Sequence, residues 1–133
     1  EIINQALQTV DLLALAKKNI NHLSGGEQQR ALLARSIATE ASILLFDEPT
    51  NSLDIKHQLE FFKLLITLRN AGKTILIAIH NVNDALKIGD KILLLHQNKI
   101  KFDGPANEPT FKSKIEECFQ IKLSNNQSYN FEL

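Results

Sequence analysis

Hydrophobic residues recur along the chain with two different spacings, and each spacing predicts one kind of element. Where apolar residues return every three or four positions, the pattern predicts amphipathic helices. These helices are expected at residues 2–16, 25–40, 55–71, 82–88 and 110–119. Where apolar residues follow one another without alternation, the pattern predicts strands that are buried on both faces. These strands are expected at residues 42–46, 74–79 and 91–96.

The order of these elements indicates the fold class. Strand, helix, strand, helix and strand in succession are typical of an α/β fold, in which helices cover a parallel sheet. Ser24 stands at the N-cap position of the helix at 25–40, and Glu27 three residues later completes a capping box. We therefore expect a well-defined helix start at Gly25.

Turn residues predict where the remaining elements end. Gly72 is expected to stop the helix before it. Asn98 is expected to turn the third strand into a paired strand at 100–102. A terminal hairpin is expected between 121–123 and 129–131, around Asn125 and Asn126.

The composition narrows the class of partner. Fifteen basic and fifteen acidic residues cancel, so no net field attracts the chain to nucleic acid, and none is expected as a partner. No stretch approaches the roughly 20 apolar residues that a membrane-spanning helix needs. The 133 residues contain no Met, not even at the start, which suggests a fragment of a longer gene product.

Two stretches carry residues suited to phosphate and magnesium chemistry. Asp47 and Glu48 follow a buried strand, at the end where α/β sheets place their ligands. There one carboxylate can hold Mg²⁺ and its neighbour can orient or deprotonate an attacking water, although two acids also commonly open a turn before a proline. Ser24, Gly25 and Gly26 open a helix with free N–H groups, which favours phosphate, although a simple helix cap has the same sequence.

His80 ends the second strand, where a neutral imidazole can contact a phosphate or a water; a capping or core role is the alternative. The three other histidines, His22, His57 and His96, share no metal-like spacing and are interpreted as solvated or structural.

Gly72-Lys73-Thr74 imitates the end of the phosphate-binding loop G-x-x-x-x-G-K-[ST]. That pattern requires glycine where Thr67 stands, and the loop should leave a strand rather than a helix. The pattern is therefore rejected here, and Lys73 is expected to be a surface turn residue.

The order and spacing of these signals resemble those of ATP-binding cassette (ABC) ATPases. The stretch LSGGEQQR at 23–30 resembles the signature motif of that family, and ILLFDE at 43–48 is similar to its Walker B strand. Residues 51–54 are similar to its D-loop, and His80 to its switch histidine. The resemblance covers nearly the whole chain and implies the C-terminal half of an ABC transporter ATP-binding subunit, with a partial P-loop NTPase fold.

The resemblance also implies three regions in the chain. They are the end of the helical subdomain with the signature loop at 1–24, the Walker B, D-loop and switch-histidine core at 25–105, and a C-terminal helix and tail at 106–133.

For nucleotide binding, the resemblance implies that Ser24, Gly25 and Gly26 contact the γ-phosphate of ATP held by the opposite subunit of a head-to-tail dimer. Glu27 belongs to the same nucleotide-binding motif, and Asp54 is expected at the dimer seam.

For catalysis, the resemblance implies that Asp47 anchors Mg²⁺, that Glu48 is the general base, and that His80 holds the γ-phosphate and the water in line. Asn81 replaces the Asp usual after this histidine in importers, and Asn51-Ser52 replaces the more frequent Ser-Ala or Ser-His. Neither departure removes a catalytic group.

The run from His80 to Pro105, with a short helix after it, looks like the importer ATPases for iron-siderophore, haem or cobalamin uptake. Such a subunit is expected to sit on permease subunits at the cytoplasmic face of the inner membrane.

Two alternatives remain open. The first is a non-transport ABC ATPase, such as a DNA-repair or ribosome-associated factor, although no heptad coiled coil flanks the signature. The second is that these 133 residues alone are not an enzyme. Without a phosphate-binding loop they could donate only the signature half-site to a complete partner.

Overall fold

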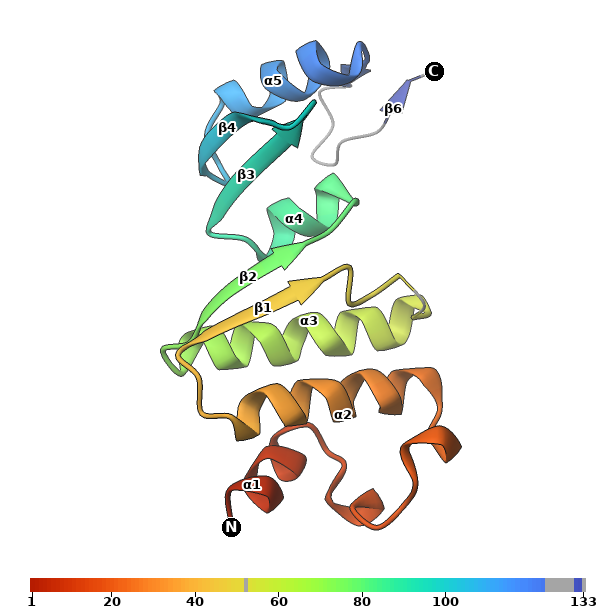
Figure 1. Ribbon diagram of the computed structural model, residues 1–133. Coiled ribbons are helices and arrows are strands. Elements are labelled where there is room, and N and C mark those ends of the chain that lie inside the picture. Colours follow the sequence, from red (N-terminus) through yellow and green to blue (C-terminus); the bar gives the residue numbers. More distant parts are fainter. Residues whose placement is uncertain (52, 124–130, 133) are drawn as a thin grey trace. The chain divides into compact units, whose positions relative to one another are not determined.

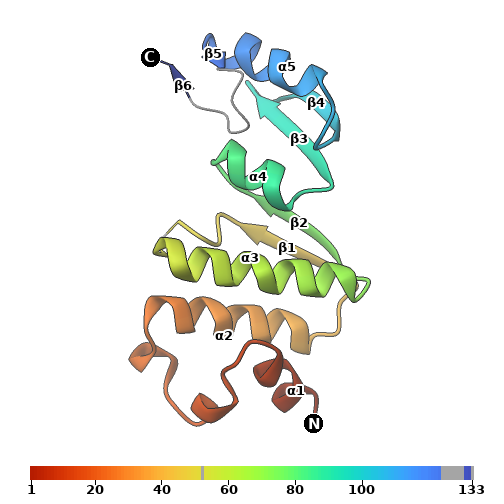
Figure 2. The same ribbon diagram turned by 180° about the vertical axis from the view of Figure 1, so that it is seen from behind.

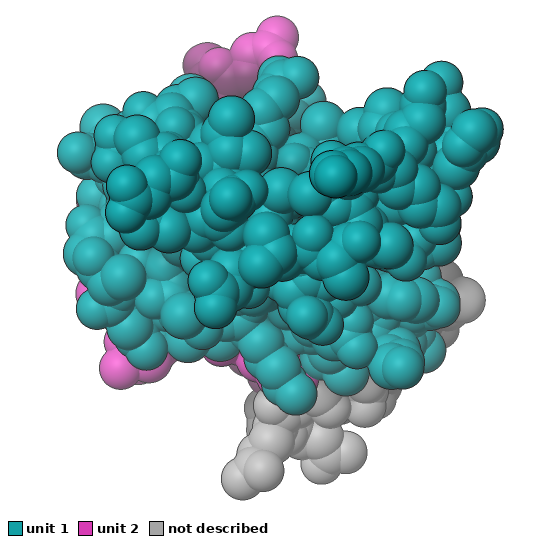
Figure 3. All heavy atoms as spheres, turned by 90° about the horizontal axis from the view of Figure 1, so that it is seen from below, with its two compact units in different colours: residues 1–78 teal, residues 79–133 magenta. Residues whose placement is uncertain are grey.

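The structure is a computed structural model that describes residues 1–51, 53–123 and 131–132. The chain divides into two units, residues 1–78 and residues 79–133, which Figure 3 shows in different colours. The three functional regions expected from the sequence are a separate division and stay a prediction.

Unit 1 contains one parallel strand pair and three α-helices. Its elements are α1 (Ile2–Thr9), two short 3-10 helices (Leu13–Leu15 and Ile20–His22), α2 (Gly25–Ala38), β1 (Ile43–Asp47), α3 (Ile55–Asn70) and β2 (Thr74–Ala78). β1 and β2 are parallel, in a register that runs from Ile43 opposite Thr74 to Asp47 opposite Ala78. This confirms an α/β arrangement with a parallel sheet and helices.

The packing of unit 1 brings the ends of three of its elements to the same side. α3 packs on the strand pair, α2 lies alongside α3, and α1 lies against α2 (Figures 1 and 2). In both views the amino ends of α2 and α3 lie on the same side as the carboxyl end of β1. The residues that the sequence marks as chemical lie at these ends.

The core of unit 1 explains why these layers hold. α3 turns four apolar side chains inward, and the ring of its Phe61 meets Phe46 of β1 edge-on at 5.8 Å between centroids. The buried hydrophobic residues of the unit are Ala6, Val10, Leu12, Leu33, Ala34, Leu44, Phe61, Phe62, Leu65 and Leu68. Full burial of one large aliphatic or aromatic side chain contributes about 1.5–3 kcal/mol, so this cluster orients the helices.

The first helix is shorter than the sequence predicts. α1 ends at Thr9 instead of near residue 16, because Asp11 adopts a left-handed backbone with φ 56°. The Leu12 N–H then donates to the Leu7 carbonyl at 2.8 Å, and the Asp11 N–H donates to the Gln8 carbonyl at 3.1 Å. These two bonds satisfy the last carbonyls of the helix, in the way that a Schellman motif does.

The expectation that the strands are buried on both faces is wrong for this chain. Leu44 of β1 is buried, but Ile43 and Leu45 on the opposite face are 60% and 70% exposed. Leu76 of β2 is likewise 55% exposed. Among the described residues of unit 1, α3 covers one face of the strand pair, so each strand alternates between covered and open positions.

Unit 2 is a hairpin packed against helices. Its elements are α4 (Val82–Ile88), β3 (Lys91–His96), β4 (Lys99–Pro105), α5 (Thr110–Phe119), β5 (Lys122–Leu123) and β6 (Phe131–Glu132). Ile92, Phe102, Phe111 and Ile115 form its core. The rings of Phe102 and Phe111 lie 4.9 Å apart and join β4 to α5.

Two expectations for unit 2 need correction. The third predicted strand, β3, does not extend the parallel sheet but pairs antiparallel with β4. Gln97 and Asn98 both have positive φ, the backbone that a two-residue hairpin turn requires, so the turn at Asn98 is confirmed. β4 continues to Pro105, well past the expected end at 102.

The predicted terminal hairpin is found as the antiparallel pair β5 and β6, with Leu123 opposite Phe131. Its expected turn at residues 125 and 126 lies outside the described residues.

Candidate functional site

The amino end of α2 is held by a complete capping box. The Ser24 N–H donates to Oε2 of Glu27 at 2.7 Å, and the Glu27 N–H donates to Oγ of Ser24 at 3.3 Å. The hydrogen bond from the Ser24 backbone lowers the pKa of Glu27, and the Ser24 side chain lowers it further. The Ser24 hydroxyl accepts here, so its hydrogen can still donate to a ligand.

Gly25 and Gly26 occupy the first turn of α2 but differ in their surroundings. Their N–H groups precede the first α-helical bond, in which Gln28 donates to the Ser24 carbonyl at 2.8 Å. A Cβ added at Gly25 would meet nothing within 4 Å, so this position is open to an approaching ligand. A Cβ at Gly26, which is buried, would lie 2.6 Å from Cδ2 of His57.

Asp47 and Glu48 lie at the carboxyl end of β1, as predicted. Glu48 adopts a left-handed backbone with φ 46°, and its N–H donates to the Ala78 carbonyl at 3.0 Å. The side-chain amide of Asn51 donates to the Glu48 carboxylate. Asp47 is exposed and Glu48 is half-buried. Two carboxylates therefore stand at the strand end, and one of them is oriented by its own loop.

Asp54 is the N-cap of α3 and also holds a histidine. Its Oδ1 accepts hydrogen bonds from the His57 N–H at 2.9 Å and from His57 Nδ1 at 2.8 Å. The bond from the His57 backbone lowers the pKa of Asp54, while the His57 side chain adds to the shift. Ser52, which precedes this cap by two residues, lies outside the described residues.

Sequence reasoning missed two partners in this region. His57 is interpreted from the sequence as solvated or structural, yet its imidazole lies between the Asp54 carboxylate and Gly26. The spacing Asp54-x-x-His57 at a helix start is the signal that could have found it. Asn51 is known from the sequence only as a departure from the family pattern, and the structure places its amide on Glu48.

His80 lies in unit 2, two residues after β2 ends, and is exposed. Asn81 is the N-cap of α4, and its Oδ1 accepts from the N–H groups of Asn83 and Asp84. A cap explains why a short oxygen-bearing side chain follows the histidine. The role of His80 beside Glu48 stays a prediction.

The stretch Gly72-Lys73-Thr74, which only imitates the end of a phosphate-binding loop, has a structural role. Lys73 lies between the end of α3 and the start of β2, and its Nζ donates to the carbonyls of Glu40 and Ala41 at 3.1 and 2.7 Å. Gly72, with φ 89°, supplies the left-handed turn that ends α3, as predicted.

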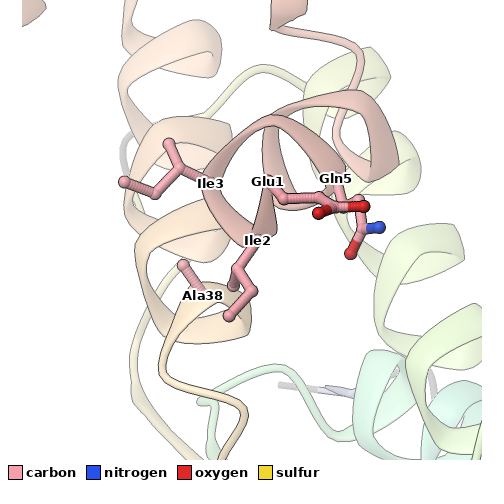
Figure 4. A pocket seen from close by; sticks show the side chains of 5 residues that line it. All are labelled: Glu1, Ile2, Ile3, Gln5 and Ala38. Carbon is pink, nitrogen blue, oxygen red and sulfur yellow. The ribbon is translucent and has the colours of Figure 1, made fainter.

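Other features of the described residues do not suggest a site. A shallow hollow beside α1 is lined by Glu1, Ile2, Ile3, Gln5 and Ala38 (Figure 4). In the part of the chain that the structure describes, no three His, Cys, Asp or Glu side chains gather as metal ligands. None of the described helices combines the length and the hydrophobicity needed to cross a bilayer.

Several known proteins are similar to this chain over most of its length. The sequence pattern of the family described as ABC transporter matches residues 1–51. The petrobactin import ATP-binding protein YclP of Bacillus subtilis is 40% identical over 122 residues, covering 91% of this chain and 48% of YclP. The hemin import ATP-binding protein HmuV of Rhodopseudomonas palustris is 36% identical over 131 residues, covering 92% of this chain and 48% of HmuV.

The fold agrees with these sequence matches. A solved structure described as an inward-facing conformation of a metal-chelate type ABC transporter matches with a TM-score of 0.84 and 30% identity. The match covers 98% of this chain and 55% of that one. The chain therefore spans about half the length of the curated relatives it matches. Over most of its length, the chain is therefore similar to about half of an ABC transporter ATP-binding protein.

Proposed function

We propose that the chain supplies the signature, Walker B and D-loop part of an ATPase that powers an ABC importer of iron-siderophore, haem or cobalamin type. The observation that carries this proposal is the open glycine turn at the start of α2. Gly25 has nothing within 4 Å of its Cβ position, and it lies on the side of unit 1 where β1 ends in Asp47. Relatives that import petrobactin and hemin support the importer branch.

In this proposal the nucleotide meets the amino end of α2. The hydroxyl of Ser24 and the N–H groups of Gly25 and Gly26 would bind the γ-phosphate, assisted by the positive end of the helix dipole. Glu27 serves the site by holding the turn in place through the capping box. ATP is the expected ligand.

The chemistry would occur at the carboxyl end of β1. Asp47 has the exposed carboxylate that suits a Mg²⁺ site, and Glu48 would act as the general base for the attacking water. The hydrogen bond from Asn51 would keep the Glu48 carboxylate in one orientation. His80 would position the γ-phosphate and the water in line. Mg²⁺ would balance the charge of the phosphates.

The partners follow from the half-site character of the glycine turn. A second ATPase subunit, packed head to tail with Asp54 at the seam, would present the bound ATP. Permease subunits would receive the work of hydrolysis, at the cytoplasmic face of the inner membrane. The 133 residues contain no G-x-x-x-x-G-K-[ST] pattern, so we expect no hydrolysis by this chain alone.

The proposal is tested in a chimera in which this chain replaces the corresponding half of YclP. Gly25→Glu should abolish ATP hydrolysis, because it puts a negative side chain where the γ-phosphate would lie. The fold should tolerate the change, since the position is open and an acidic residue suits a helix start. ATP affinity, which depends on the YclP half, should change by less than about threefold.

Ser113→Glu, an acidic substitution on the exposed face of α5, is the matched control and should leave turnover unchanged. If Gly25→Glu hydrolyses ATP as fast as the control, then the glycine turn does not meet the γ-phosphate and the proposed function is wrong.

A further inference from the structure

The imidazole of His57 lies between two segments that belong to separate sequence motifs. Its Nδ1 lies 2.8 Å from Oδ1 of Asp54, the residue that caps α3. Its Cδ2, Cγ and Nε2 lie 2.6, 2.9 and 3.2 Å from the place where a Cβ would stand on Gly26 of α2. The ring thus contacts the D-loop on one side. On its other side it contacts the signature turn, which is the stretch from Ser24 to Glu27 at the start of α2.

The hydrogen bond to Asp54 fixes the ring. The carboxylate of Asp54 is ionised at neutral pH, since hydrogen bonds from His57 lower its pKa. An ionised carboxylate only accepts, so Nδ1 must carry the hydrogen that it donates. The same oxygen also accepts from the His57 backbone N–H, so the ring and the first turn of α3 share one anchor.

The fixed ring explains why residue 26 must be glycine. Any side chain at this buried position would overlap ring atoms that Asp54 holds in place. A Cβ added at the neighbouring Gly25 would meet nothing within 4 Å, so no contact within this chain requires glycine there. The two glycines are therefore needed for different reasons. Gly26 leaves room for the ring of His57, whereas Gly25 leaves the start of α2 open to an approaching ligand.

We propose that His57 is a positioning residue that couples the D-loop to the signature turn, by holding Gly26 against the start of α3. A shift of Asp54 would therefore move the ring of His57 and the first-turn amides of α2 with it. The consequence for ATP turnover rests on the proposed function, whereas the contact itself does not.

The contact is tested first in the 133-residue chain by a double-mutant cycle. Gly26→Ala should raise the ratio of unfolded to folded chain about tenfold at the denaturant midpoint of the parent chain, because the new methyl group overlaps the ring. In a His57→Ala background the same change should cost much less, since Ala lacks all three of these ring atoms while the backbone N–H of residue 57 can still donate to Asp54. Gly25→Ala is the matched control and should behave alike in both backgrounds.

An amide NMR spectrum supplies a second measurement that does not need a folded Gly26→Ala variant. His57→Asn should shift the Gly26 amide resonance and leave that of Gly72, at the far end of α3, in place. The inference is overturned if the Gly26 resonance does not move, or if Gly26→Ala is equally costly in both backgrounds.

The positioning role is tested in the YclP chimera. His57→Asn should lower kcat for ATP about tenfold and change the KM little, because the turn would then be misplaced only when it must meet the γ-phosphate. If His57 served only to keep the protein folded, His57→Asn would lower the amount of active enzyme but would not shift the Gly26 amide resonance. If the NMR and stability results hold but kcat is unchanged, the coupling inference fails for the reaction, while the Gly25→Glu experiment still decides the proposed function.

Discussion

The side chain of Glu27 holds the signature turn in place. Its carboxylate accepts the Ser24 N–H at 2.7 Å, and the Ser24 hydroxyl accepts the Glu27 N–H in return. Both donors belong to the group of helix-start amides that have no partner within the helix. These two donors are thus satisfied inside the chain, and the ligand contacts that we propose fall to the amides of Gly25 and Gly26.

The lowered pKa of Glu27 predicts a pH dependence of stability. Because the folded state favours the ionised carboxylate, its contribution is present above the ordinary value of 4.5 and is lost as the pH falls through the folded pKa. Glu27→Gln should therefore lower the urea midpoint at pH 7, and the difference from the parent should shrink toward pH 3. Glu40→Gln, for which we expect no such loss, is the control; an equal effect of both variants at pH 7 would contradict the assignment.

At the scale of single residues, the sequence predicted which side chains are important but not all of the residues that they contact. Ser24 and Glu27 were predictable because a capping box is a local pattern of four residues. The contact between His57 and Gly26 was not, because it joins two helices separated by a strand and depends on how α2 lies beside α3. The same holds for Lys73, whose ammonium reaches carbonyls more than thirty residues away.

At the scale of elements, the helices follow the sequence pattern more closely than the strands do. α3, α4 and α5 begin at the predicted residues, since their apolar spacing is a local pattern and Asp54 and Asn81 cap the first two of these helices. The apolar runs of β1 and β2 correctly predict strands, but a run without alternation does not say what covers each face. Ile43 and Leu45 remain exposed in this chain, although the pattern predicts burial.

The end of α1 gives a test of how a local backbone state limits an element. Asp11 has φ 56°, and glycine adopts that conformation without the steric cost of a Cβ. Asp11→Gly should therefore stabilise the chain by about 0.5 kcal/mol, the net of relieved strain and a more flexible unfolded chain.

Gln8→Gly, on the exposed part of the same helix, should instead destabilise the chain by about 0.5–1 kcal/mol. Urea unfolding of the two variants measures the contrast. Equal destabilisation by both would mean that Asp11 does not terminate α1 in solution.

For the molecule as a whole, the two units divide the predicted chemistry. Unit 1 contains the signature turn, the carboxylates of β1 and the cap of α3, whereas His80 belongs to unit 2. The chain also spans about half of its relatives' length, and unit 1 exposes apolar strand residues such as Leu45. Both facts agree with the proposed function, in which this chain acts together with partner subunits.

The catalytic role of Glu48 is tested most directly by single-turnover ATP hydrolysis in the YclP chimera carrying Glu48→Gln. We predict that hydrolysis falls by at least about a hundredfold, because Gln cannot accept a proton from the attacking water, while ATP binding is kept. Glu40→Gln in the same chimera should hydrolyse ATP at the parent rate. If the Glu48→Gln chimera turned over at the parent rate as well, Glu48 would not be the general base, and this chain would not carry the catalytic carboxylate.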